Sequence, residues 1–177
     1  MAQITYHIDS AHSAAHFSVR HLMISNVRGE FTKVSGTVTY DGQNPENSTV
    51  EARIDAASIN TREPQRDAHL KSADFFDVAK YPEITFHSKS AAIEDDILLV
   101  KGDLTIHGVT REVTLRVEGP TPETKDPWGN LRIGAEATTK IDRRDFGLVY
   151  NAVMEAGGLM LGDDIKISID VEAVRQA

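Results

Sequence analysis

Residues 98–117 read LLVKGDLTIHGVTREVTLRV, and this stretch decides the fold class. Every second position of 98–106 is apolar or glycine, and the same holds for 113–117. A period of two gives a strand one buried and one wet face, which is the pattern of antiparallel sheets. Between the two halves, His107-Gly108 supplies a short hairpin loop. The stretch therefore predicts two neighbouring antiparallel strands.

The same alternation recurs through most of the chain. It is found in 6–8, 17–19, 34–40, 50–54, 84–86, 131–137 and 165–171. Together with the opening pair, these segments predict about eight or nine strands with little helix between them. An antiparallel sheet of that size protects its edges by closing into a barrel or by stacking as a sandwich. Both architectures fit the periodicity.

One segment, Thr61–Asp77, interrupts the alternation. Leu70 and the Phe75-Phe76 pair lie among polar residues there, which predicts one or two short helical turns packed on a barrel end. Tyr81-Pro82 then ends this insert. Further along, Ala156-Gly157-Gly158 predicts a turn before the last strand.

The composition restricts the function. The 177 residues carry 27 acidic and 19 basic side chains, for a net charge of −8. That balance argues against nucleic-acid binding and disfavours docking by simple attraction to an anionic membrane. The absence of cysteine excludes disulfides, zinc–thiolate sites and cysteine nucleophiles. No run approaches the roughly 18 apolar residues of a transmembrane helix.

Length and the first residues suggest organisation and location. The length fits one domain, and no repeat or linker divides the chain. The opening MAQITY lacks the basic stretch and apolar core of a signal peptide. We therefore expect a cytoplasmic protein, or a periplasmic one whose leader has been removed.

Small residues on the apolar faces bear on whether the interior is hollow. They are Gly36, Ala52, Gly102, Ala135 and Ala137. Such residues on an inner wall leave volume for a ligand inside an eight-stranded barrel. Alternatively, larger side chains opposite them fill that volume, because native cores keep few voids.

Several blocks of the sequence resemble the YceI-like family of polyisoprenoid-binding proteins. The two main ones are QRDAHLKSADFF at 65–76 and KYPEITF at 80–86. The supporting blocks, in the family's order, are 9–13, 17–21, 102–110, 142–148 and 155–158. The resemblance covers nearly the whole chain.

The resemblance implies a single all-β domain over residues 1–177. Its expected fold is an extended eight-stranded antiparallel, lipocalin-like barrel with one short helical insert. It further implies a polyisoprenoid ligand, such as ubiquinone or a polyprenyl phosphate, no cofactor, and often a homodimer. Many members of the family are exported to the periplasm.

We therefore expect a non-enzymatic protein that holds the lipid in its lumen for transport, storage or sensing. The lumen should set the affinity and polar groups at its mouth should set the orientation. The residues expected to contact the lipid are Phe17, Val19, His21, Val38, Tyr40, Ala52, Ile54, Arg66, His69, Leu70, Phe75, Phe76, Ile84, Phe86, Ala135, Ala137 and Phe146.

Histidines near the start raise the question of a metal site. His12 and His16 lie four residues apart and His21 follows, but the intervening residues 17–19 have an extended pattern. No HExxH motif or further ligand at a recognised spacing accompanies them. These histidines are therefore interpreted as structural or headgroup-contacting, and no metal is expected.

Other polar residues carry alternative interpretations. Arg66, Asp67 and His69 either bind a headgroup or satisfy one another and cap a helix. Arg143 and Asp145 are predicted to form a structural pair at a barrel corner. Asp74 is predicted to be a helix cap.

Catalysis is the alternative function. An enzyme acting on a bound apolar substrate would need a lumen-facing acid–base group, and His21 or His69 would supply it. The sequence contains no G-x-S-x-G elbow, Walker A loop or dinucleotide fingerprint. The absence of a nucleophile–base signature favours binding.

Overall fold

Antiparallel strands make up most of the computed structural model, which describes residues 3–22, 24–151 and 161–176. The predicted Ala156-Gly157-Gly158 turn and the 155–158 block lie outside these residues. The strands are β1 (Ile4–Ile8), β2 (Ala14–His21), β3 (Ser25–Phe31), β4 (Val34–Tyr40), β5 (Thr49–Asp55), β6 (Ile59–Asn60), β7 (Glu83–Glu94), β8 (Ile97–Ile106), β9 (Val109–Glu118), β10 (Thr124–Lys125), β11 (Leu131–Asp142) and β12 (Leu161–Arg175).

The helices of the described residues are short. They are the α-helix α1 (Pro64–Lys71) and the 3-10 helices η1 (Ser10–His12), η2 (Pro45–Asn47), η3 (Ala56–Ser58) and η4 (Arg143–Phe146). Among these residues, none of the helices is long and apolar enough to cross a membrane.

Eight of the strands close into a ring. Following the hydrogen-bonded neighbours, β1 pairs with β4, then come β5, β7, β8, β9, β11 and β12, and β12 pairs back with β1. All of these pairings are antiparallel. The prediction of a closed eight-stranded barrel is confirmed, and the two-sheet sandwich is wrong.

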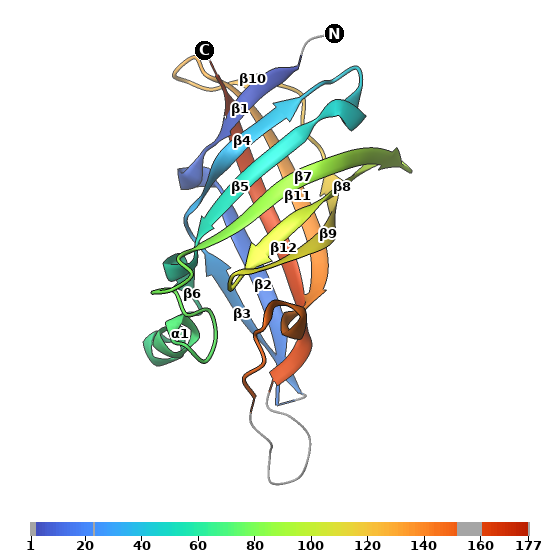
Figure 1. Cartoon of the computed structure of the whole chain (residues 1–177). Helices are drawn as coiled ribbons and strands as arrows, with labels where there is room; N and C mark the ends of the chain where they lie inside the picture. Colours follow the sequence, from blue (N-terminus) through green and yellow to red (C-terminus); the bar gives the residue numbers. More distant parts are fainter. Residues whose placement is uncertain (1–2, 23, 152–160, 177) are drawn as a thin grey trace.

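The wall is extended on one side, as Figure 1 shows. β2 continues β1 beyond η1, and β6 continues β5 beyond η3. β3 leads into β4 through Thr32-Lys33. β2 pairs with β12 and β3, and β3 pairs with β6. The 15-residue β12 accordingly faces β2 along its first part and β1 at its end.

The hairpin predicted from residues 98–117 joins β8 and β9 in the structure. His107 and Gly108 have φ angles of 56° and 72°. Two successive positive φ angles define the tight hairpin turns whose twist matches that of the strands. The hairpin prediction is confirmed.

β3, which belongs to the extension of the barrel wall, was not predicted from the sequence. Its inward residues Val27 and Phe31 are separated by Gly29, and this glycine weakens the alternation. A Cβ at position 29 would lie 2.5 Å from Cζ of Phe17, so a larger residue would force this ring to shift. The aromatic ring of the neighbouring strand thus takes the place of a side chain on β3.

The interrupted segment forms the predicted helical insert beside β6 (Figure 1). Pro64 stands at the first turn of α1, and the Glu63 carboxylate accepts a hydrogen bond from the backbone N–H of Gln65. Both features favour helix initiation. The cap residues of α1 are Glu63 and Ser72, so the prediction that Asp74 caps a helix is wrong. The Asp74 carboxylate instead lies 2.8 Å from His69 Nε2.

Candidate functional site

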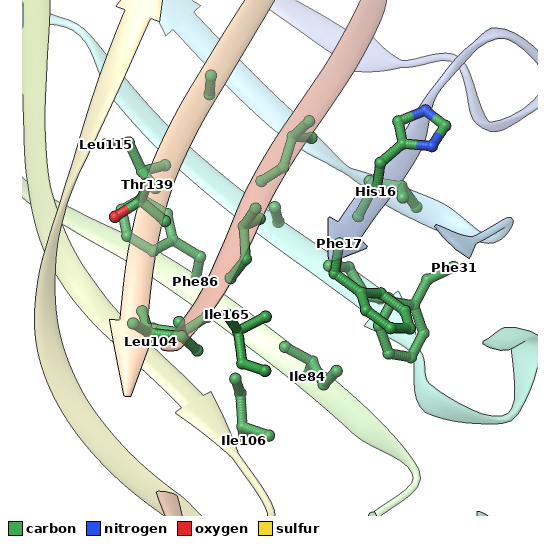
Figure 2. Close-up of a pocket in the computed structure, with 18 of the residues that line it drawn as sticks. His16, Phe17, Phe31, Ile84, Phe86, Leu104, Ile106, Leu115, Thr139 and Ile165 are labelled. Carbon is green, nitrogen blue, oxygen red and sulfur yellow. The ribbon is translucent and has the colours of Figure 1, made fainter. Parts of the chain in front are cut away.

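The interior of the barrel contains a cavity of about 540 Å³. Figure 2 shows side chains from several strands directed toward it, among them Phe86, Leu104, Leu115 and Ile165. Cavities of this size are typical of small-molecule binding sites. The prediction that Ile84 and Phe86 face inward is confirmed.

All but one of the residues predicted to contact a lipid line this cavity. They are Phe17, Val19, His21, Val38, Tyr40, Ala52, Ile54, Arg66, His69, Leu70, Phe75, Phe76, Ile84, Phe86, Ala135 and Ala137. The exception is Phe146, which is 1% exposed and packs in the hydrophobic core at η4 without lining the cavity. Contact of any of them with a lipid stays a prediction.

The structure divides the small residues of the wall into two kinds. Ala52, Ala135 and Ala137 line the cavity. Gly36 and Gly102 leave no volume, because a Cβ there would lie 2.0 Å from the Glu51 carbonyl oxygen and 2.5 Å from that of His87, respectively. Close approach of a neighbouring strand explains both glycines. The interpretation that these two residues leave volume for a ligand is therefore wrong, and at Gly102 the alternative holds, because the Phe86 ring fills the space.

An aromatic column joins the insert to the barrel wall. The rings of Phe17 and Phe31 lie 5.6 Å apart between centroids (Figure 2), and Phe76 meets Phe31 edge-on at 5.5 Å. Edge-on and tilted pairs are favourable arrangements of aromatic rings. Phe76 from the insert therefore covers this side of the cavity.

A second aromatic cluster lies at the same end. His69 packs edge-on against Phe75 and Tyr150, with both centroid distances at 5.0 Å. Its Nε2 atom lies 2.8 Å from the Asp74 carboxylate. The ring orientation of His69 is thus determined by packing and by one polar partner.

Arg66 has a structural partner in the insert. Its Nε and Nη2 atoms donate to Oγ1 and the carbonyl oxygen of Thr61, at 2.8 and 2.7 Å. The Asp67 carboxylate accepts bonds from the same residue's N–H and hydroxyl, at 2.8 and 2.6 Å. Arg66 and Asp67 therefore meet at Thr61, while Arg66 also lines the cavity.

Arg143 is the buried cation of the cavity wall, at 4% exposure. Nη1 donates to the carbonyl oxygens of Leu148 and Tyr150, at 2.6 and 2.9 Å, and Nε donates to that of Gly162 at 2.9 Å. Burial lowers the pKa of this guanidinium below its usual value. The carboxylate near Arg143 is that of Asp163, at 3.6 Å, so the predicted pair with Asp145 is wrong.

The cavity lining contains basic side chains but no acidic ones among the described residues. Among the described residues, the lining contains Arg66, Arg143, His16, His21 and His69 but no Asp or Glu. Most of the remaining lining residues are aliphatic or aromatic. The interior is therefore suited to an apolar molecule, with cationic or neutral groups as its polar contacts.

His12 and His16 contact different carboxylates. His12 lies in η1 with Nδ1 2.8 Å from the Asp9 carboxylate. His16 lies on β2, 3.7 Å from Glu30 and 3.4 Å from Asp170. In residues 3–22, 24–151 and 161–176, no group of three potential ligands is placed to hold a metal ion.

A nucleophile–base pair needs a hydroxyl within hydrogen-bond reach of a histidine. Within the described part of the chain, the histidine hydrogen bonds join His12 to Asp9 and His69 to Asp74, and neither partner is a hydroxyl. The described residues therefore show no nucleophile–base pair, while His21 and His69 both line the cavity.

The fold and the site together define a closed antiparallel β-barrel that encloses an apolar cavity. The chain belongs to the YceI-like family, whose domain profile matches residues 6–173. Protein YceI of Escherichia coli O17:K52:H18 is 39% identical over 173 residues, which cover 97% of this chain and 87% of that protein.

Solved structures share the fold. BcnA of Burkholderia cenocepacia matches with a TM-score of 0.79 at 22% identity, covering 93% of this chain and 98% of BcnA. A polyisoprenoid-binding domain from Saccharophagus degradans matches with a TM-score of 0.70 at 18% identity, covering 98% of this chain and 99% of that domain.

Proposed function

We propose that this protein holds a polyisoprenoid lipid, such as ubiquinone or a polyprenyl phosphate, for transport, storage or sensing. The observation that carries the proposal is the apolar cavity enclosed by the barrel. Membership of the YceI-like family and the likeness to the polyisoprenoid-binding domain of Saccharophagus degradans support it.

The physical chemistry of an apolar cavity favours a ligand with a long hydrocarbon chain. Each buried CH₂ group contributes about 0.8 kcal/mol, so one five-carbon isoprene unit contributes at most roughly 4 kcal/mol. A hydrogen bond to a headgroup contributes only about 1 kcal/mol. Two buried isoprene units therefore dominate the affinity even after the costs of ordering the chain.

Lipid extraction tests the proposal directly. The purified protein is extracted with organic solvent, and the extract is analysed by mass spectrometry. The protein is then offered a panel of detergent-dispersed ubiquinones and polyprenyl phosphates. Co-purification or saturable uptake of an isoprenoid is expected. A folded protein that carries no isoprenoid and takes up none contradicts the proposal.

The homodimer implied by the family resemblance is also proposed for this chain. Light scattering coupled to size-exclusion chromatography measures the mass of the particle. A dimer mass is expected, and a monomer mass at micromolar concentration contradicts this part of the proposal.

A further inference from the structure

Exposed apolar side chains gather where the β2–β3 hairpin turns. Leu22 and Ile24 flank this turn, and Ile24 is 79% exposed. Val149, 64% exposed, precedes Tyr150 in the segment after η4. Figure 1 shows the hairpin and this segment at one end of the barrel, remote from the chain termini.

These side chains border the cavity. His21 next to Leu22, and Tyr150 next to Val149, both line it. Asn151 exchanges two hydrogen bonds with the backbone of Leu161, at 2.8 and 3.0 Å, and Leu161 pairs with His21. The hairpin and the segment after η4 are thereby held together at the same end of the cavity.

A row of cations crosses the outer face of the sheet just behind this end. Arg28 on β3 pairs with Ser18 on β2, Ser18 pairs with Lys166 on β12, and Lys166 pairs with Lys140 on β11. We call Arg28, Lys166 and Lys140 the basic row. All three are exposed. Lys166 and Lys140 stand directly opposite each other, an arrangement that is unfavourable between like charges in a sheet.

On the β2–β3 hairpin, the local charge is opposite to the net charge of −8. Residues 18–28 read SVRHLMISNVR and contain no acidic side chain. In the described part of the chain, no carboxylate lies within 4 Å of a side-chain nitrogen of Arg20, Arg28 or Lys166, whereas Lys140 contacts Asp164 at 3.5 Å. On β11 and β12, Asp142 and Asp164 pair two residues beyond Lys140 and Lys166 toward this end. The excess of cations at this end therefore lies on β2 and β3, at Arg20 and Arg28.

We propose that this end of the barrel docks on the surface of an anionic lipid bilayer. Leu22 and Ile24 enter the boundary between headgroups and acyl chains, and the basic row and Arg20 lie against the headgroups. Apolar side chains in front of a cationic patch are the combination that binds proteins to such surfaces. Passage of a lipid between bilayer and cavity rests on the proposed function, but docking does not.

Vesicle co-sedimentation tests the docking. The full chain is mixed with vesicles of phosphatidylcholine alone, or of phosphatidylcholine with an equal amount of phosphatidylglycerol. Binding to the anionic vesicles is expected, weakening as salt is added. Ile24→Asp should weaken binding at least tenfold, whereas Ile93→Asp, 49% exposed at the end of β7, is the matched control and should leave it unchanged.

The basic row has its own variants. Arg28→Gln and Lys166→Gln should each weaken vesicle binding about fivefold, because each Lys or Arg near an anionic leaflet raises the binding constant by roughly that factor. Glu136→Gln, on the outer face of β11 away from the hairpin turn, should not weaken it. Equal binding to neutral and anionic vesicles, or no effect of Ile24→Asp, overturns the proposal.

Two further outcomes separate this inference from the proposed function. A wild-type protein that yields isoprenoid on extraction but ignores anionic vesicles overturns the docking and leaves the function standing. Vesicle binding by a protein that never takes up isoprenoid supports the docking and contradicts the function. If Ile24→Asp converts a dimer to a monomer and no vesicles are bound, this surface joins two copies of the chain and the docking proposal is wrong.

Discussion

The ring of Phe86 occupies the space beside Gly102 on the next strand. A Cβ on Gly102 would lie 2.6 Å from Cζ of Phe86 and 2.5 Å from the carbonyl oxygen of His87. Phe86 pairs with Leu104, and the register of β7 and β8 shifts between Ser88 and Ser90. The large ring and the glycine are therefore complementary parts of one wall.

Gly102→Ala should lower the free energy of unfolding by about 1–3 kcal/mol, because the methyl group forces the ring or the strand to move. Urea denaturation measures the change. Gly42→Ala is the matched control, since a Cβ there meets only a ring carbon of Tyr40 at 3.7 Å, an ordinary contact. An equal loss in both variants would show that the crowding at Gly102 is unimportant.

Ala137→Phe should block lipid binding by filling the cavity that Ala137 lines. Overpacking should cost about 1–3 kcal/mol of stability without preventing folding. Isoprenoid bound per protein after extraction is the measurement. Glu136→Phe places the same ring on the outer face of β11 and should retain the lipid. Full occupancy of the Ala137→Phe protein would place the ligand elsewhere.

Polar residues at the α1 end should matter less for affinity than the wall does. His69→Ala or Arg66→Ala should weaken isoprenoid binding by about 1–3 kcal/mol, the contribution of a hydrogen bond to a charged partner. Titration with a dispersed isoprenoid measures this change. If His69→Ala leaves lipid retention intact and abolishes turnover of the bound lipid, the protein is an enzyme.

Arg143→Met should destabilise the protein by about 3 kcal/mol or more. The substitution leaves the carbonyl oxygens of Leu148, Tyr150 and Gly162 without this donor, and buried unpaired polar groups are costly. The adjacent Arg144→Met serves as the control, because that guanidinium is exposed and its loss should cost much less stability. Chemical denaturation measures the free energy of unfolding of both variants, and an equal loss in the two would contradict the prediction.

Acid should destabilise the protein through Asp9. Hydrogen bonds from Arg132 and His12 lower the pKa of the Asp9 carboxyl from 3.8 to about 2. Since the folded-state pKa lies below the unfolded one, the stabilisation is complete above the unfolded value and is lost as the pH falls toward about 2. Asp9→Asn should cost about 1–3 kcal/mol at neutral pH. Its unfolding free energy should also decline less steeply in acid than that of the wild type.

Much of the fold was predictable because alternation is a local property. A period of two in 98–106 and 113–117 specifies which face of each strand is buried, whatever the strands' partners are. For the same reason, the strand residues expected to contact the lipid do line the cavity, whereas those of the 61–77 insert were expected from the family resemblance. β3 was not predicted because Gly29 interrupts its apolar alternation. The ring of Phe17 fills the space beside Gly29, and this contact forms only in the folded protein.

Only the tertiary structure decided which strands and polar groups meet. Arg143 was expected beside Asp145, two residues away, but its partners are backbone carbonyls as distant as Gly162. Likewise Arg28, Lys166 and Lys140 form one row only because β3, β2, β12 and β11 pair in that register. Side-chain period depends on neighbouring residues, whereas register and ion pairing depend on strands that are remote in sequence and adjacent only after the barrel closes.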